Sequence, residues 1–142
     1  MHATAEPALS EYNARVLDCQ EDAFTLAYYA LGDDGQAEHV VQAAVNQAFW
    51  GFDGSEVRCR EQILSAVAEG CRKTAMRRPA AQCVFAALPI EERLAVILVD
   101  VLTLSYRQAA EILRRPEAQF TRLLAQGRYR MMNETTDSVV KK

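Results

Sequence analysis

The chain has 142 residues, enough for one domain or two small ones, and half of its residues are hydrophobic, which is sufficient for a modest core. Its six glycines and four prolines are few, whereas Ala, Leu, Glu, Arg and Gln abound, so the composition predicts an all-α fold. No apolar run is long enough to span a membrane, and the formal net charge of −3 excludes a uniformly basic surface.

Three helices are expected in the first half, and glycine-containing breaks separate them. The first spans residues 11–31 and ends at the Gly-Asp-Asp-Gly break of residues 32–35. The second spans residues 36–50 and has the strongest helical period of apolar residues in the chain. The third spans residues 56–77, and Pro79 stops it.

The second half predicts a helix-turn-helix. Apolar residues at helical spacing predict a helix over residues 90–102. Ser105 opens a short helix over residues 106–113, and Gln108, three residues after Ser105, makes the two a capping-box candidate. Pro116 can occupy the first position of a third helix, which carries arginines. A short helix followed by a tight turn and a long, arginine-bearing helix is typical of this motif.

Charge is distributed unevenly along the chain. Residues 1–70 carry twelve acidic and three basic side chains, whereas residues 71–87 carry four basic side chains and no acidic one. Residues 88–132 carry seven basic and five acidic side chains. A basic surface for nucleic acid is therefore expected only from the middle and the C-terminal half, and it is thin in both.

No metal-binding or catalytic pattern is present. Cys19, Cys59, Cys71 and Cys83 are far apart and include no CxxC pair, which favours a reduced cytoplasmic protein over a metal site or a thiol redox sensor. No signal peptide is evident at the N-terminus. Because nothing resembles a nucleophile–base pair, a phosphate loop or a set of metal ligands, we expect no enzyme activity, cofactor or small-molecule substrate.

Two ordered sets of motifs indicate a family. The second half contains Leu88-Pro89, Arg93, Asp100, Leu104-Ser105-Tyr106, Ala110-Glu111-Ile112-Leu113, Pro116, Leu124 and Arg128. The first half contains Leu31-Gly32-Asp33, Ala37-Glu38, Val41-Gln42, Ala48, Phe49-Trp50, and then Arg72, Arg77 and Arg78. The second set resembles region four, and the first set region two, of bacterial extracytoplasmic-function sigma factors of the sigma-70 family. The alternative for the second half is a three-helix bundle that only packs, but apolar spacing alone does not require Leu-Ser-Tyr.

This resemblance implies two small helical bundles joined by a short linker. The region-two-like domain would cover residues 11–78, the linker residues 79–87, and the region-four-like helix-turn-helix domain residues 88–133. The tails at residues 1–10 and 134–142 are expected to be flexible. The resemblance also implies a cytoplasmic transcription protein that binds RNA polymerase core and promoter DNA, with an anti-sigma factor as a further partner.

The resemblance assigns contacts to two surfaces. Gln and Arg side chains suit base edges and phosphates. The implied DNA-binding residues are Arg114, Arg115, Gln119, Arg122, Gln126 and Arg130. The implied residues for polymerase or another protein partner are Glu38, His39, Gln42 and Leu123.

Departures from the family pattern favour a second hypothesis. The family usually places acidic residues at the positions of His39 and Ala43, and an arginine at the position of Leu123, which is expected to be exposed. A linker of about ten residues reaches roughly 35 Å when extended, whereas promoter binding separates the two halves by on the order of 70 Å. The alternative is therefore a sigma mimic whose halves pack together and which binds an anti-sigma factor or another regulator, without promoter binding.

Overall fold

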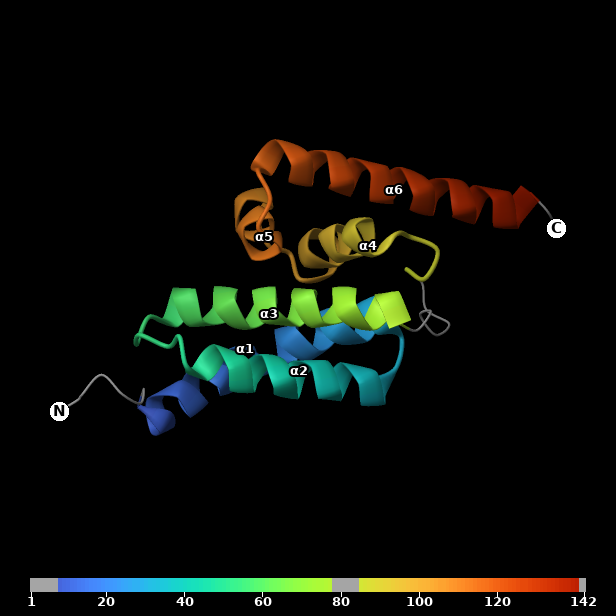
Figure 1. The fold of residues 1–142 in the computed structure, drawn as a ribbon. Helices are drawn as coiled ribbons and strands as arrows, with labels where there is room; N and C mark the ends of the chain where they lie inside the picture. The colour runs from blue at the N-terminus through green and yellow to red at the C-terminus, as the bar shows by residue number, and fades with distance from the viewer. Residues whose placement is uncertain (1–7, 78–84, 141–142) are drawn as a thin grey trace.

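The computed structural model describes residues 8–77 and 85–140, with side chains described as far as residue 133. Every regular element in these ranges is a helix, which confirms the predicted all-α class (Figure 1). The elements are α1 (Leu9–Leu31), α2 (Asp34–Phe49), α3 (Glu56–Arg77), α4 (Ile90–Val96), the π-helical turn η1 (Ile97–Val101), α5 (Tyr106–Leu113) and α6 (Glu117–Val140).

Local capping signals set the ends of the first helices. Gly32 ends α1 in the left-handed conformation, with φ of 72°, and its N–H donates to the carbonyl of Tyr28 at 2.7 Å. The side chain of Asp33 then accepts the N–H of Gln36 at 2.7 Å, as an N-cap. Because of this cap, α2 begins at Asp34, earlier than the predicted residue 36, and the break between the helices is shorter than expected.

The predicted helix over residues 90–102 is α-helical only in its first part. From Ile97 onward the chain widens into η1, where the N–H of Leu102 donates to the carbonyl of Ile97, five residues earlier, at 3.0 Å. Thr103 follows with φ of 58°, which ends the helix ahead of Ser105. Apolar spacing shows which face is buried but not which carbonyl each N–H reaches, so the sequence did not predict this change of winding.

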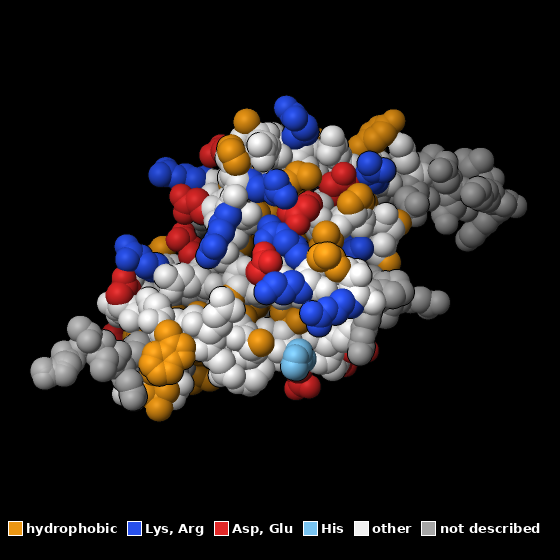
Figure 2. Space-filling view, in the orientation of Figure 1, with side chains coloured by type: hydrophobic (Ala, Val, Ile, Leu, Met, Phe, Trp, Pro, Cys, Tyr) orange, Lys and Arg blue, Asp and Glu red, His pale blue; other side chains and the backbone are white. Residues whose placement is uncertain are grey.

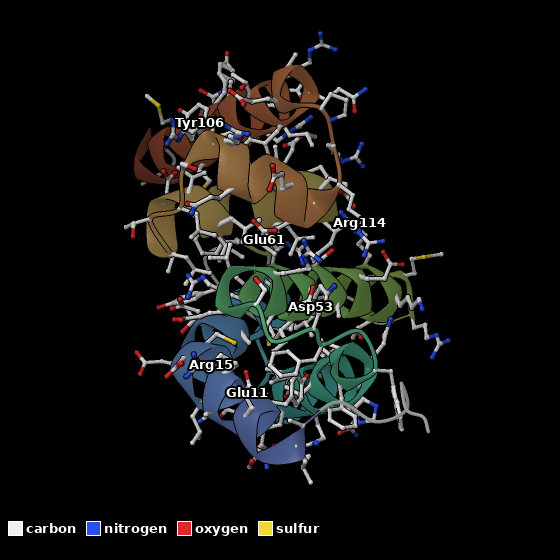
Figure 3. All side chains as sticks on the ribbon, turned by 90° about the vertical axis from the view of Figure 1, so that its left-hand side faces the viewer. Glu11, Arg15, Asp53, Glu61, Tyr106 and Arg114 are labelled. Atoms are coloured by element: carbon white, nitrogen blue, oxygen red, sulfur yellow. The ribbon has the colours of Figure 1, made fainter. Side chains whose placement is uncertain are left out.

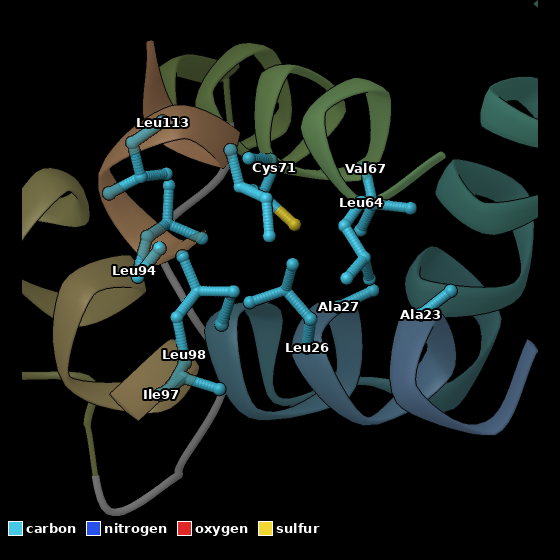
Figure 4. Packing of buried hydrophobic residues seen from close by; sticks show 14 of the residues in the cluster. Ala23, Leu26, Ala27, Leu64, Val67, Cys71, Leu94, Ile97, Leu98 and Leu113 are labelled. Carbon is cyan, nitrogen blue, oxygen red and sulfur yellow. The ribbon is translucent and has the colours of Figure 1, made fainter. Parts of the chain in front are cut away.

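The two groups of helices, α1–α3 and α4–α6, pack directly on each other with α3 between them (Figure 1). Their apolar side chains form one continuous buried cluster rather than two separate cores. Figure 4 shows where the groups meet, with Leu26 and Ala27 of α1, Leu64, Val67 and Cys71 of α3, Leu94 of α4, Ile97 and Leu98 of η1, and Leu113 of α5. Of the predicted linker, residues 79–84 lie outside the described residues, whereas Phe85 is buried in the shared core.

Both ends of the helical body extend further than the sequence indicated. The predicted flexible tail over residues 134–142 is helical as far as Val140, because α6 continues past the helix-turn-helix. At the other end, α1 begins at Leu9, inside the predicted tail of residues 1–10. Residues 1–7 and 141–142 are not among the described residues.

We expect the capping residue and the core to contribute different amounts to stability. Ser105→Ala removes the acceptor of the Gln108 N–H and should lower the free energy of unfolding by about 1 kcal/mol. Leu98→Ala opens a cavity between the two groups of helices and should lower it by roughly 2–5 kcal/mol. Urea unfolding measures both, with Ser10→Ala, an exposed serine in α1, as the matched control that should change little. Equal, negligible effects of Ser105→Ala and Leu98→Ala would contradict the fold.

Candidate nucleic-acid and partner interfaces

A tight turn sets the orientation of α6 relative to α5. At the start of α5 the predicted capping box is present: the Gln108 N–H donates to Ser105 Oγ, and the Ser105 N–H donates to Gln108 Oε1, both at 3.1 Å. At its end Arg114 takes the left-handed conformation, with φ of 57°, and its N–H donates to the carbonyls of the preceding turn. The Phe120 N–H donates to the carbonyl of Pro116 at 3.0 Å, so α6 begins right after the proline, as the sequence predicted. These local bonds fix the angle of the helix-turn-helix.

One face of α6 is packed tightly on α4. Phe120 and Leu124, both predicted to point inward, are buried. Gly127 lets the two backbones approach, because a Cβ on this residue would lie 2.7 Å from Cγ2 of Val96 and 3.2 Å from the carbonyl oxygen of Glu92. The packed side of α6 is thereby fixed, and its opposite side faces solvent.

The solvent-facing side of α6 carries three of the predicted DNA-binding residues. Gln119, Arg122 and Gln126 recur at intervals of three and four residues and are all exposed. Arg122 forms no ion pair or hydrogen bond within the part of the chain that the structure describes. We call these three residues the outer face of α6.

The other predicted residues of this half lie differently. Arg130 is bound to Glu92 of α4, with Nε 2.8 Å from Oε1, and Arg115 forms an ion pair of 3.2 Å with Glu91. Arg114 is exposed and lines a pocket of about 270 Å³ next to α2 and α3. Leu123, expected to be exposed, is half-buried against the core. The structure thus brings Gln119, Arg122 and Gln126 together but ties Arg115 and Arg130 to internal carboxylates.

Arg128 fixes α6 to the rest of the motif, a role that sequence reasoning did not assign. Its guanidinium donates to both carboxylate oxygens of Asp100, at 2.6 and 3.1 Å, and to the hydroxyl of Tyr106 at 3.2 Å. Hydrogen bonds to Asp100 and Tyr106 raise the pKa of Arg128, so its charge is retained. Asp100, Tyr106 and Arg128 are all among the residues that carry the family resemblance, but their spacing in sequence did not indicate that they meet.

The predicted partner-binding residues of the first half line a groove between α1 and α2. It has a volume of about 730 Å³, and Glu38, His39 and Gln42 line it from α2. From α1 it receives Gln20, Glu21 and Phe24, which the sequence analysis did not single out. We call this the α1–α2 groove; it is acidic, with an aromatic side chain in its wall. Leu123, the fourth predicted residue, lies on α6 in the other group of helices and does not belong to it.

His39 lies on the ridge between this acidic groove and a more basic pocket. A second pocket, of about 540 Å³, is lined by His39 together with Thr74 and Arg77 of α3. Lys73 lines a neighbouring pocket that also includes His39. Among the described residues, no group of three or more His, Cys, Asp and Glu side chains could hold a metal ion. No helix in the described ranges combines the length and hydropathy needed to cross a membrane.

Two carboxyl groups face each other where α3 meets α5. Figure 3 shows Glu61 on the side of α3 toward α5, the helix that carries Glu111. Desolvation by burial and then the neighbouring Glu111 raise the pKa of Glu61 above its ordinary value of 4.5. Burial and the nearby Glu111 therefore favour the protonated form of Glu61 at this contact between the two groups of helices.

Comparisons with known proteins agree with this geometry. Residues 79–131 match the family described as sigma-70, region 4. The fold is similar to that of the sigma factor RpoE in its complex with the anti-sigma factor NepR from Bartonella quintana, with a TM-score of 0.66 and 17% sequence identity. The similarity covers 87% of this chain and 96% of that chain. A search of curated proteins found no match.

The Glu61–Glu111 contact predicts a pH dependence of stability. A carboxyl whose pKa is raised by folding binds more protons in the folded state, so it makes the free energy of unfolding fall as the pH rises above 4.5. Glu61→Gln should remove this contribution, and the variant should lose less stability than the wild type between acidic and neutral pH. Urea unfolding at several pH values measures the difference. Glu38→Gln, at an exposed position of α2, is the control. Parallel pH curves for wild type and Glu61→Gln would contradict the prediction.

Proposed function

We propose that this chain acts in transcription initiation by binding promoter DNA and RNA polymerase core. The match of residues 79–131 to sigma-70 region 4, which confirms the predicted resemblance of this half, and the sigma-factor-like fold support the proposal. The observation that carries the proposal is the outer face of α6, exposed on a helix whose other side is fixed by packing and by Arg128. In this proposal the protein supplies binding contacts, and we assign no catalysed reaction to it. Such partners place its action in the cytoplasm.

The chemistry of the outer face of α6 suits duplex DNA. Glutamine amides can both donate to and accept from base edges, and an arginine guanidinium can bind guanine or a phosphate. Gln119 and Gln126 flank Arg122, whose charge is not neutralised by a neighbouring carboxylate in the described chain. A helix held rigidly from behind loses little conformational freedom when it enters a groove. We therefore assign base and phosphate contacts to these three residues.

The α1–α2 groove suits a basic, partly apolar protein surface. Glu21 and Glu38 supply negative charge on opposite walls, and Phe24 supplies apolar area. His39 lines this groove at a position where the family usually has an acid, and Ala43, the second such position, lines a neighbouring pocket against α3. This surface of α2 therefore has less negative charge than the resemblance leads us to expect. We propose that polymerase core docks here, and that the missing charges weaken the docking.

The packing of the two groups of helices favours a second candidate function. A single buried core joins α1 and α3 to α4, η1 and α5, whereas promoter binding by both halves requires a separation on the order of 70 Å. One similar solved structure is that of a sigma factor in complex with an anti-sigma factor. A sigma mimic that occupies an anti-sigma factor, without promoter binding, would work in the packed form.

DNA binding tests the proposal through Arg122. Arg122→Glu should weaken binding to duplex DNA and flatten the dependence of the affinity on salt, because one phosphate contact is lost and a repulsive charge is added. Fluorescence anisotropy at several salt concentrations measures both quantities. Arg58→Glu, the same charge change at an exposed position of α3, is the matched control. Wild-type protein that shows no salt-dependent DNA binding would favour the sigma mimic.

Polymerase binding tests it through the α1–α2 groove. Two charge-assisted contacts of about 1.5–3 kcal/mol each are absent at His39 and Ala43. Wild-type protein should therefore bind core at least about tenfold more weakly than protein that has acids at both positions of α2. His39→Asp combined with Ala43→Glu should strengthen co-elution with purified core. Asn13→Asp with Ala14→Glu adds the same charge to exposed positions of α1 and should not. Tight wild-type binding that the His39/Ala43 substitutions leave unchanged would place the docking surface elsewhere.

A further inference from the structure

Three charged side chains meet where α3, α4 and the turn before α6 come together. Glu91 of α4 accepts from Nε of Arg72 at 2.6 Å and from its Nη2 at 3.2 Å. The same carboxylate accepts from Nε of Arg115 at 3.3 Å and forms an ion pair with its Nη2 at 3.2 Å. We call Arg72, Glu91 and Arg115 the charge clasp. Figure 2 shows Lys/Arg and Asp/Glu side chains interleaved across this middle part of the molecule.

The charge clasp connects the two groups of helices. Arg72 belongs to α3, and it also donates to Glu69 of α3 and to the carbonyl of Leu113 at the end of α5. Burial works to raise the pKa of Glu91, but hydrogen bonds and charge interactions with Arg72 and Arg115 hold it below its ordinary value. Glu91 is therefore a carboxylate at neutral pH, and it binds both arginines as an anion.

Arg115 is thereby engaged by an internal anion. Its side chain is 35% exposed, and the Nε and Nη2 atoms that face Glu91 are also the atoms that a phosphate would accept from. Arg122, seven residues further along the chain, has no such internal partner among the described residues. A phosphate and the Glu91 carboxylate thus compete for one guanidinium edge.

We propose that Glu91 is an internal competitor of DNA: within the α4–α6 group its carboxylate occupies Arg115, so a phosphate must displace Glu91 before Arg115 can bind DNA. The inference rests on the proposed function, because it requires that the helix-turn-helix binds DNA. Arg72 of α3 binds the same carboxylate, so displacement of Glu91 from Arg115 leaves the contact between the two groups in place.

The first experiment measures DNA affinity. Glu91→Gln keeps the shape of the side chain but removes its charge, and it should raise the affinity for duplex DNA about three- to tenfold at low salt. Asp34→Asn makes the same change in net charge at the exposed start of α2 and is the matched control. In an Arg115→Gln background the gain from Glu91→Gln should disappear, because the guanidinium that it releases is no longer there.

The second experiment measures packing independently of DNA affinity. Cys71 is fully buried where the two groups meet (Figure 4), so its reaction with a thiol reagent reports their separation. Burial also raises the pKa of this thiol to about 12, which slows its reaction further in the packed form. In protein carrying Cys83→Ser, labelling of Cys71, located by peptide mass spectrometry, should keep its slow rate when DNA is added, because the Arg72–Glu91 contact between the groups is retained. Labelling that DNA accelerates would show that DNA acts by separating the groups and would overturn the inference.

The outcomes separate the two proposals. Salt-dependent DNA binding that Arg122→Glu weakens, but that Glu91→Gln changes no more than Asp34→Asn does, overturns the inference and leaves the proposed function in place. A gain in affinity that persists in the Arg115→Gln background also overturns it, because the effect would then be one of net charge. Absence of DNA binding in wild type and Glu91→Gln alike rejects the DNA-binding function, and the inference with it.

Discussion

The arrangement of the two groups of helices depends on one buried arginine at their contact. Arg93 of α4 is 7% exposed, and its guanidinium donates to the carbonyl of Ala30 at 2.6 Å and to that of Leu88 at 2.7 Å. An arginine cannot lose its proton at neutral pH, so a buried one must find acceptors. Ala30 lies in the last turn of α1, where the carbonyls carry the negative end of the helix dipole. Moving α4 away from α1 would break this bond and expose the apolar residues around it.

Signals within a few residues were sufficient to predict most helix ends. Contacts between residues far apart in the chain could not be predicted from the sequence. Ser105 with Gln108, and Gly32 with Asp33, act on neighbouring backbone groups, so their effect can be read locally. The bond from Arg130 to Glu92 joins residues 38 positions apart, and no periodicity indicates it. Helix position marks Arg130 as outward-facing, but a long side chain can still reach back to an acid on the adjoining helix. The sequence therefore predicted the fold and the outer face of α6 better than the individual roles of its arginines.

Pairing inside the fold reduces the positive charge available to DNA. In sequence, residues 88–132 carry seven arginines. Within the described structure five of them have internal acceptors: Arg93 on carbonyls, Arg107 on Glu111, Arg115 on Glu91, Arg128 on Asp100 and Arg130 on Glu92. Arg114 and Arg122 remain for an external anion. Net charge along the chain overstates the basic surface, because a paired arginine contributes little to the field that a phosphate experiences.

The two proposed binding surfaces lie on opposite sides of the packed body. In Figure 1, α2 and α6 are on the outside, with α3 and α4 between them. Packed helices lie about 8–10 Å apart, so the surfaces are separated by far less than the distance on the order of 70 Å that two promoter elements require. Separation would expose Leu98, Cys71 and their neighbours to water, and ion pairs at the edge contribute much less than this apolar burial. A partner that opens the protein must therefore cover that apolar surface as well as displace the charge clasp, whereas a partner that recognises the packed form needs to do neither.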